Sequence, residues 1–155
     1  MCYKKAGQTP KNPEQLAEIR IPFPEAYHTN LIYDNESPRS RILVFASEDS
    51  LGLLELAPTW FMDRTFSTAP HVFEQVFTKR VPLGVTLGTA AFALLPSKEQ
   101  ATYDECLTAI LDACLAREIR PTQSKVVCDF EVAIHNEVRQ VMSNDIQLQV
   151  SCIKK

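Results

Sequence analysis

The feature that most constrains the fold is a helix that lies between two apolar strands in the second half of the chain. In LLPSKEQATYDECLTAILDACLAREIRP, apolar residues recur at helical spacing from Tyr103 to Cys114, and Ser97 and Gln100 have the spacing of a capping box. The run over residues 84–95 precedes this helix and is apolar with little alternation, as is typical of a strand covered on both faces. The short run KVVCDF follows the helix as a buried strand. These elements predict a sheet with a helix packed on it.

The remaining elements extend this pattern in both directions. Strands are expected over residues 30–33, 41–46, 60–66, 72–78 and 146–150, and helices over 49–56 and 131–142. From residue 60 the order is β-β-β-α-β-α-β, which indicates an α/β fold with helices packed on a mixed sheet; ribonuclease-H-like folds have this order. Residues 1–28 are rich in proline and are interpreted as a leader or linker, residues 29–150 as the domain, and residues 151–155 as a tail.

Composition places the chain among single-domain globular proteins. It has 155 residues, of which 45% are hydrophobic and 23% are charged, and a chain of this length buries roughly 70% of its unfolded surface. The net charge of −3 disfavours a general nucleic-acid footprint, although a bound metal ion can supply local positive charge. The five cysteines lack C-x-x-C spacing, and no apolar run reaches the ~18 residues of a membrane span. We expect an intracellular chain with no membrane partner.

Two aspartates stand at corresponding positions, each where an expected strand ends. Asp63 follows the apolar run WFM, and Asp129 follows KVVC where the next helix begins. Functional groups gather at the carboxyl ends of strands in open α/β sheets, so neighbouring strands would bring these carboxylates together. Two close carboxylates repel unless a divalent cation neutralises them, and Mg²⁺ favours one or two carboxylates with waters and phosphate oxygens. Two alternatives stay open: Asp129 caps the following helix, and Asp63 is a turn residue that pairs with Arg64.

Four motifs resemble the transposase domain of Mutator-like elements, the MULE type. The chain has D-R-T-F at residues 63–66, P-x-x-F-x-Q at 70–75, L-L-P-x-K-x-x-x-T-Y at 94–103 and D-F-E-x-A at 129–133. The family shows motifs of these kinds in the same order, with D-G-T-F as the first. The resemblance runs from about residue 30 to residue 142, which is most of the chain.

This resemblance implies a ribonuclease-H-like fold and metal-dependent chemistry on DNA in the nucleus. In the family, an Asp, a second Asp and a Glu bind two divalent ions. These ions activate a water or a 3′-hydroxyl and stabilise the leaving oxygen during attack on a DNA phosphodiester. By motif, Asp63 matches the first acid and Asp129 the second, both as ligands of Mg²⁺ or Mn²⁺. Phe66 and Phe130 are expected to pack in the core.

The chain departs from the family pattern at two points. Arg64 replaces the usual Gly beside the first acid, where it could either reach a phosphate or obstruct the metal. No residue matches the third acid, because Glu131 and Glu137 are interpreted as solvated helix charges and Asp145 as a loop residue. We therefore expect a C-terminally truncated transposase catalytic domain that is inactive alone. The alternative is a non-catalytic regulatory or protein-binding module derived from a transposase.

Such a truncation also predicts association. A domain without its last elements would leave a sheet edge or an apolar face uncovered, which favours binding to other transposase segments or to a second copy.

Three cysteines and one basic pair complete the expectations. Cys106, Cys114 and Cys128 are expected to be small core residues. Lys79 and Arg80 are interpreted as a solvated turn near a strand end.

Overall fold

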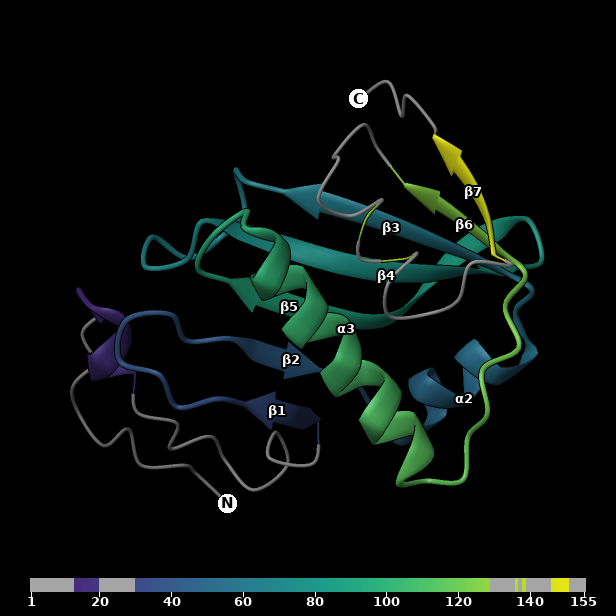
Figure 1. Cartoon of the computed structure of the whole chain (residues 1–155), viewed down its shortest axis with the longest axis horizontal. Helices are drawn as coiled ribbons and strands as arrows, with labels where there is room; N and C mark the ends of the chain where they lie inside the picture. The colour runs from purple at the N-terminus through teal and green to yellow at the C-terminus, as the bar shows by residue number, and fades with distance from the viewer. Residues whose placement is uncertain (1–12, 20–29, 129–135, 137, 139–145, 151–155) are drawn as a thin grey trace, which may run out of the picture.

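The chain forms an α/β structure on one mixed sheet (Figure 1). The computed structural model describes residues 13–19, 30–128, 136, 138 and 146–150. In these residues seven strands form the sheet, in the order β1-β2-β5-β4-β3-β6-β7. The strands are β1 (Leu31–Asp34), β2 (Leu43–Phe45), β3 (Thr59–Thr65), β4 (Gln75–Leu83), β5 (Thr86–Leu95), β6 (Lys125–Cys128) and β7 (Gln147–Val150). The helices are the 3-10 helix η1 (Leu16–Glu18), α2 (Glu48–Leu56) and α3 (Gln100–Leu115).

The centre of the sheet is an antiparallel meander of β3, β4 and β5. On one side β6 lies parallel beside β3, and β7 lies parallel beside β6. On the other side β2 pairs antiparallel with β5, and β1 pairs antiparallel with β2. Because β5 and β6 run in the same direction, they need a crossover connection, and α3 lies in it.

The helix α3 lies across one face of the sheet (Figure 1). Its apolar side is the predicted one, since Tyr103, Leu107, Ile110 and Cys114 are all buried. The Tyr103 ring packs edge-on against Phe77 of β4, with the ring centroids 5.6 Å apart. Each large apolar side chain buried here contributes about 1.5–3 kcal/mol, so this layer is the main hydrophobic core.

The capping box lies at α2 rather than at α3, where it was predicted. The Ser47 side chain accepts a hydrogen bond from the Ser50 backbone, and the Ser50 side chain accepts one from the Ser47 backbone. At α3 the cap is Glu99, which makes no side-chain cap bond. Because the helix begins at Gln100, Ser97 lies two residues before the cap position, and its hydroxyl pairs with that of Thr102 at 2.7 Å.

The strand predicted over residues 72–78 instead covers residues 75–83. Because Lys79 and Arg80 lie within it, the interpretation of this pair as a solvated turn is wrong. The strand β4 continues to Leu83, and the turn into β5 is made at Gly84, whose φ is +60°. Alternation along β4 places Lys79 on the face under α3, where its Nζ lies 4.4 Å from the centroid of the Trp60 ring. The packing of its aliphatic stem and the ring's attraction for a cation offset part of the cost of burying this charge. Arg80 is half-buried within the same strand.

Two expectations about the core are confirmed. Cys106, Cys114 and Cys128 are buried. Val138, which the predicted helix over 131–142 places on its apolar side, is also buried in the core. The rest of that helix, and most of residues 1–28, lie outside the described residues. Among the helices that the structure describes, none combines the length and the apolar character needed to cross a bilayer.

Candidate functional site

Asp63 lies near the end of β3, on the face of the sheet opposite α3. Trp60 and Met62 are fully buried towards α3, so strand alternation turns Asp63 to the other face, where it is half-buried. Its Oδ1 accepts a hydrogen bond from the Arg64 backbone N–H at 2.8 Å, and its backbone oxygen accepts one from the Thr78 hydroxyl at 3.3 Å. The described residues donate no hydrogen bond to Oδ2.

The strand that carries Asp63 and the strand that precedes Asp129 in the sequence are neighbours, as the metal hypothesis requires. The strand β6 lies parallel to β3, and the last pair in the described register is Met62 with Cys128. Each member of that pair immediately precedes one of the aspartates in the sequence. Asp129 itself lies outside the described residues, so its distance from Asp63 stays a prediction, as does its alternative role as a helix cap.

Two cations and an aromatic ring gather at the same end of β3. Phe66 follows the strand, with the Arg64 Cζ 5.1 Å and the Lys98 Nζ 4.5 Å from its ring centroid. Lys98 also pairs with Glu74 at 3.1 Å. Phe66 is 40% exposed, so the prediction that it packs in the core is wrong. Phe66 is exposed because β3 ends at Thr65, so Phe66 lies beyond the covered part of the sheet.

Two of the sequence motifs meet in a buried hydrogen-bond network. The Gln75 Nε2 donates a hydrogen bond to the Ser97 backbone oxygen at 2.8 Å. The Tyr103 hydroxyl lies 2.8 Å from the same Nε2 and 3.1 Å from the Gln75 Oε1. Gln75 and Tyr103 are fully buried. This network joins β4 to the start of α3, which gives these motif residues a structural role that the sequence analysis missed. The feature of the sequence that indicates this role is Gln75 itself, a glutamine at a position that strand alternation places in the core.

A second polar network fixes β1 against α3. The Tyr33 hydroxyl donates to the Glu105 carboxylate at 2.7 Å, and the Asn35 amide donates to the same oxygen at 2.9 Å. Burial, followed by the interaction with Glu105, raises the pKa of Tyr33 to about 12. Beside it, Arg41 forms a two-point contact with Asp34, at 3.0 and 2.7 Å. Although burial opposes it, this contact lowers the pKa of the Asp34 carboxyl. These satisfied groups stabilise an edge of the sheet.

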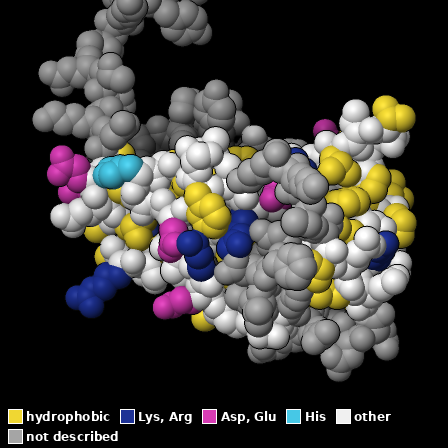
Figure 2. Space-filling view, turned by 90° about the horizontal axis from the view of Figure 1, so that it is seen from above, with side chains coloured by type: hydrophobic (Ala, Val, Ile, Leu, Met, Phe, Trp, Pro, Cys, Tyr) yellow, Lys and Arg dark blue, Asp and Glu magenta, His cyan; other side chains and the backbone are white. Residues whose placement is uncertain are grey.

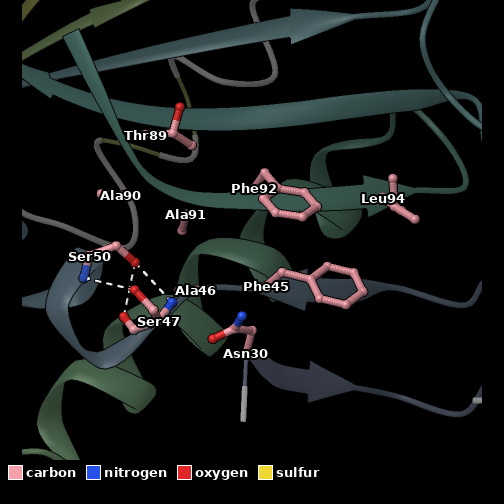
Figure 3. A pocket seen from close by; sticks show the side chains of 10 residues that line it. All are labelled: Asn30, Phe45, Ala46, Ser47, Ser50, Thr89, Ala90, Ala91, Phe92 and Leu94. Carbon is pink, nitrogen blue, oxygen red and sulfur yellow. Dashed lines mark hydrogen bonds between the residues drawn. The ribbon is translucent and has the colours of Figure 1, made fainter. Parts of the chain in front are cut away.

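A hollow of about 570 Å³ opens beside β2, β5 and the start of α2 (Figure 3). Its lining is Asn30, Phe45, Ala46, Ser47, Ser50, Thr89, Ala90, Ala91, Phe92 and Leu94. The Phe45 and Phe92 rings stack with their centroids 5.0 Å apart. The lining residues that the structure describes include no Asp, Glu, His, Lys or Arg.

The register connects this hollow with Asp63. Phe45 pairs with Phe92, Phe92 with Thr78, and Thr78 with Asp63. Directly paired residues point to the same face, so all four side chains lie on the face away from α3. The candidate carboxylate and the apolar hollow therefore share one side of the sheet.

The described residues contain no group of three or more His, Cys, Asp or Glu side chains able to hold a metal ion. Glu131, Glu137 and Asp145, the other carboxylates considered for the third acid, lie outside them, as does Phe130. Comparisons with protein-family models, with curated proteins and with solved structures gave no match.

Proposed function

We propose that this chain is part of a DNA transposase catalytic domain of Mutator-like type, with a ribonuclease-H-like fold, and that it acts in the nucleus. Asp63 and Asp129 together bind a divalent cation, Mg²⁺ or Mn²⁺. The observation that carries this proposal is the parallel register of β3 and β6, which pairs Met62 with Cys128, the residues that immediately precede the two aspartates in the sequence. The meander of β3, β4 and β5, followed by α3 and two strands parallel to β3, supports the ribonuclease-H-like arrangement.

The environment of Asp63 fits a metal ligand. Its Oδ1 is oriented by the Arg64 backbone N–H, while Oδ2 accepts no hydrogen bond from the described residues. A carboxylate with one oriented and one open oxygen suits a hard cation that keeps several waters. A bound divalent cation would supply activation of the attacking oxygen and stabilisation of the leaving oxygen at a DNA phosphodiester. In this proposal the side chains bind and orient, and neither aspartate transfers a proton.

We also propose that this chain by itself does not cleave DNA. Of the three acids that the family uses, two have matching residues in this sequence. Binding of a cation and of DNA needs fewer groups than cleavage does. We therefore expect binding without strand cutting, unless another segment supplies a third carboxylate.

A second candidate function is a non-catalytic protein-binding module derived from a transposase. It is favoured by exposed apolar side chains at the end of the sheet opposite Asp63: Leu56, Leu83, Val85 and Leu87. Figure 2 shows hydrophobic side chains gathering at the end where α2 and the β4–β5 turn lie in Figure 1. Exposed apolar clusters of this kind are common at protein interfaces. Other transposase segments or a second copy of the chain are the partners that this reading proposes.

Thermal unfolding with and without millimolar Mn²⁺ tests the metal site. A cation at ~100 times its dissociation constant stabilises the folded state by about 2.7 kcal/mol, or roughly 5–10 °C in Tm at this size. The wild type and the Asp112→Asn control should show this rise, since Asp112 is exposed on α3. The Asp63→Asn, Asp129→Asn double variant should lose it. An equal response in all three proteins, or none in the wild type, rejects the metal site.

A further inference from the structure

We propose that the chain associates with a second copy of itself through the apolar end of the sheet, with Val85 of each copy entering a small hollow on the other. This inference rests on the second candidate function, the protein-binding module, and deepens it by naming the partner. It is independent of the proposed metal site, because Asp63 lies at the opposite end of β3.

The first half of the contact is Val85, which projects from the tight turn between β4 and β5. Leu83 pairs with Thr86 across this turn, and the Thr86 hydroxyl donates a hydrogen bond to the Leu83 backbone oxygen at 3.1 Å. Val85 is fully exposed to solvent. Tight turns favour glycine, asparagine and other polar residues, so the turn gives no reason for a branched apolar side chain here. Leu83 and Leu87 are exposed beside it, so Val85 belongs to an apolar patch rather than standing alone.

The second half of the contact is a hollow of about 160 Å³ beside the same turn. It lies between α2, the connection to β3 and the end of β4, and its described lining residues are all apolar, Leu56 and Pro82 among them. An apolar cavity of about 150 Å³ holds a molecule of benzene, which is larger than the isopropyl group of valine. Leu56 is 82% exposed, so the rim leaves apolar surface for a partner to cover. The described lining does not include Val85, so the projection and the hollow are separate features of one surface.

Gly88 helps to shape this hollow. A Cβ at Gly88 would clash with the Leu83 Cδ1 and would lie 3.8 Å from the Leu53 Cδ1. The Leu83 side chain therefore occupies the space that a side chain at position 88 would take, next to Leu53 of α2. Leu83 and Leu53 both line the hollow. Because Leu83 also flanks the turn, this packing fixes the position of the projecting turn relative to the hollow.

The absence of charge on this surface favours a second copy over a charged partner. Residues 81–88 contain no Asp, Glu, Lys or Arg. On the side of α2, the Glu55 carboxylate accepts a hydrogen bond from the Arg120 backbone N–H at 3.2 Å. In a two-fold interface a patch meets itself, so any charge that it carried would face a like charge. The uncharged turn avoids that repulsion.

The surface is also self-complementary, as a two-fold interface requires. If Val85 of one copy enters the hollow of the second, Val85 of the second enters the hollow of the first. The turn and the hollow share Leu83, so they lie next to each other at one end of the sheet. Burial of these apolar side chains in both copies removes apolar surface from water, which drives association. An unrelated protein would need only one of the two features, so their presence together favours a second copy.

Analytical ultracentrifugation of the whole chain over a range of concentrations tests this interface. The wild type should change reversibly from the mass of one copy to that of two as the concentration rises. Val85→Asp should raise the dissociation constant of the dimer by about a hundredfold, since a carboxylate would have to enter an apolar hollow at two symmetric places. Val85→Thr keeps the branched shape but adds a hydroxyl, and should raise the constant by about tenfold.

Two further variants separate this contact from general effects. Leu56→Gln makes the rim of the hollow polar, so it should also weaken the dimer. Ala101→Asp adds the same charge as Val85→Asp at the start of α3, which lies away from α2 (Figure 1), and should leave the dissociation constant unchanged. Val85, Leu56 and Ala101 are all exposed, so each variant should keep the wild-type circular dichroism spectrum.

The outcomes separate this inference from the proposed functions. A wild type that stays a single copy at every concentration overturns the second copy as the partner. Other transposase segments then remain as partners of the module, and the Mn²⁺ response still tests the metal site. A dimer that Val85→Asp and Leu56→Gln leave unchanged also overturns the inference, because the copies then meet elsewhere. Equal weakening by Ala101→Asp overturns it as well, because the effect would then be one of net charge.

Discussion

At the residue scale, Gln75 shows how a polar group is retained inside the core. It is fully buried in β4, beside Phe77, and its amide contacts both the Ser97 backbone and the Tyr103 hydroxyl. A buried amide without partners is costly, so each contact matters more than an exposed hydrogen bond does. The network ties the start of α3 to the strand next to β3, and so to the position of Asp63.

Removal of both partners should therefore cost less than the sum of the two separate removals. We expect Tyr103→Phe to lower the free energy of unfolding by about 1–3 kcal/mol, because the Gln75 amide loses a buried partner. Adding Gln75→Leu should cost less than the sum of the two single changes, with a coupling of about 0.5–3 kcal/mol. Urea unfolding of the four proteins measures this coupling, and strictly additive changes would contradict the network.

At the scale of elements, the turn between β4 and β5 sets where each strand begins and ends. Leu83 and Thr86 form the last pair, so Gly84 and Val85 make a two-residue turn. Such turns need a positive φ at their first central residue, and Gly84 adopts +60°. This turn lets β4 run past Lys79, which thereby lies in the core.

Two glycine substitutions should have opposite effects on stability. A Cβ at Gly84 or Gly52 meets no atom within 4 Å, so neither change creates a clash. Gly84→Ala should still destabilise by about 1 kcal/mol because of its positive φ, and Gly84→Asn by less. Gly52→Ala, inside α2, should stabilise by roughly 0.5–1 kcal/mol. Chemical denaturation measures both, and a neutral Gly84→Ala would contradict the turn geometry.

The elements also show what sequence patterns can and cannot predict. Apolar periodicity predicts α3 and its buried side, because packing along one helix depends on local spacing. It misplaces β4, because a Lys-Arg pair resembles a solvated turn unless the Trp60 ring over Lys79 is known. The partners of Gln75, Ser97 and Tyr103, are 22 and 28 residues away, and Lys98 is 32 residues from Phe66, so none of these contacts follows from a local pattern. The strands that carry Asp63 and precede Asp129 follow from the pattern, whereas the adjacency of β3 and β6 required the sheet order.

At the scale of the whole molecule, the two ends of β3 carry different chemistry. Asp63 and the cluster of Arg64, Phe66 and Lys98 lie where the strand finishes. The exposed apolar residues Leu83 and Val85 lie at the other end, beside the start of the strand. A polar, charged end suits a nucleic acid and a cation, and an apolar end suits a protein partner. Both candidate functions can therefore exist on one molecule without competing for a surface.

The most direct test of the central claim is whether positions 63 and 129 lie side by side. Neighbouring strands are about 4.8 Å apart, within the ~4.4–6.8 Å between Cα atoms that a disulfide spans. After mild oxidation, the Asp63→Cys, Asp129→Cys variant should form a disulfide between these two positions, identified by peptide mass analysis. The Asp112→Cys, Asp129→Cys variant serves as the control. A folded protein in which positions 63 and 129 remain unlinked, or link no more than the control pair, would contradict the account.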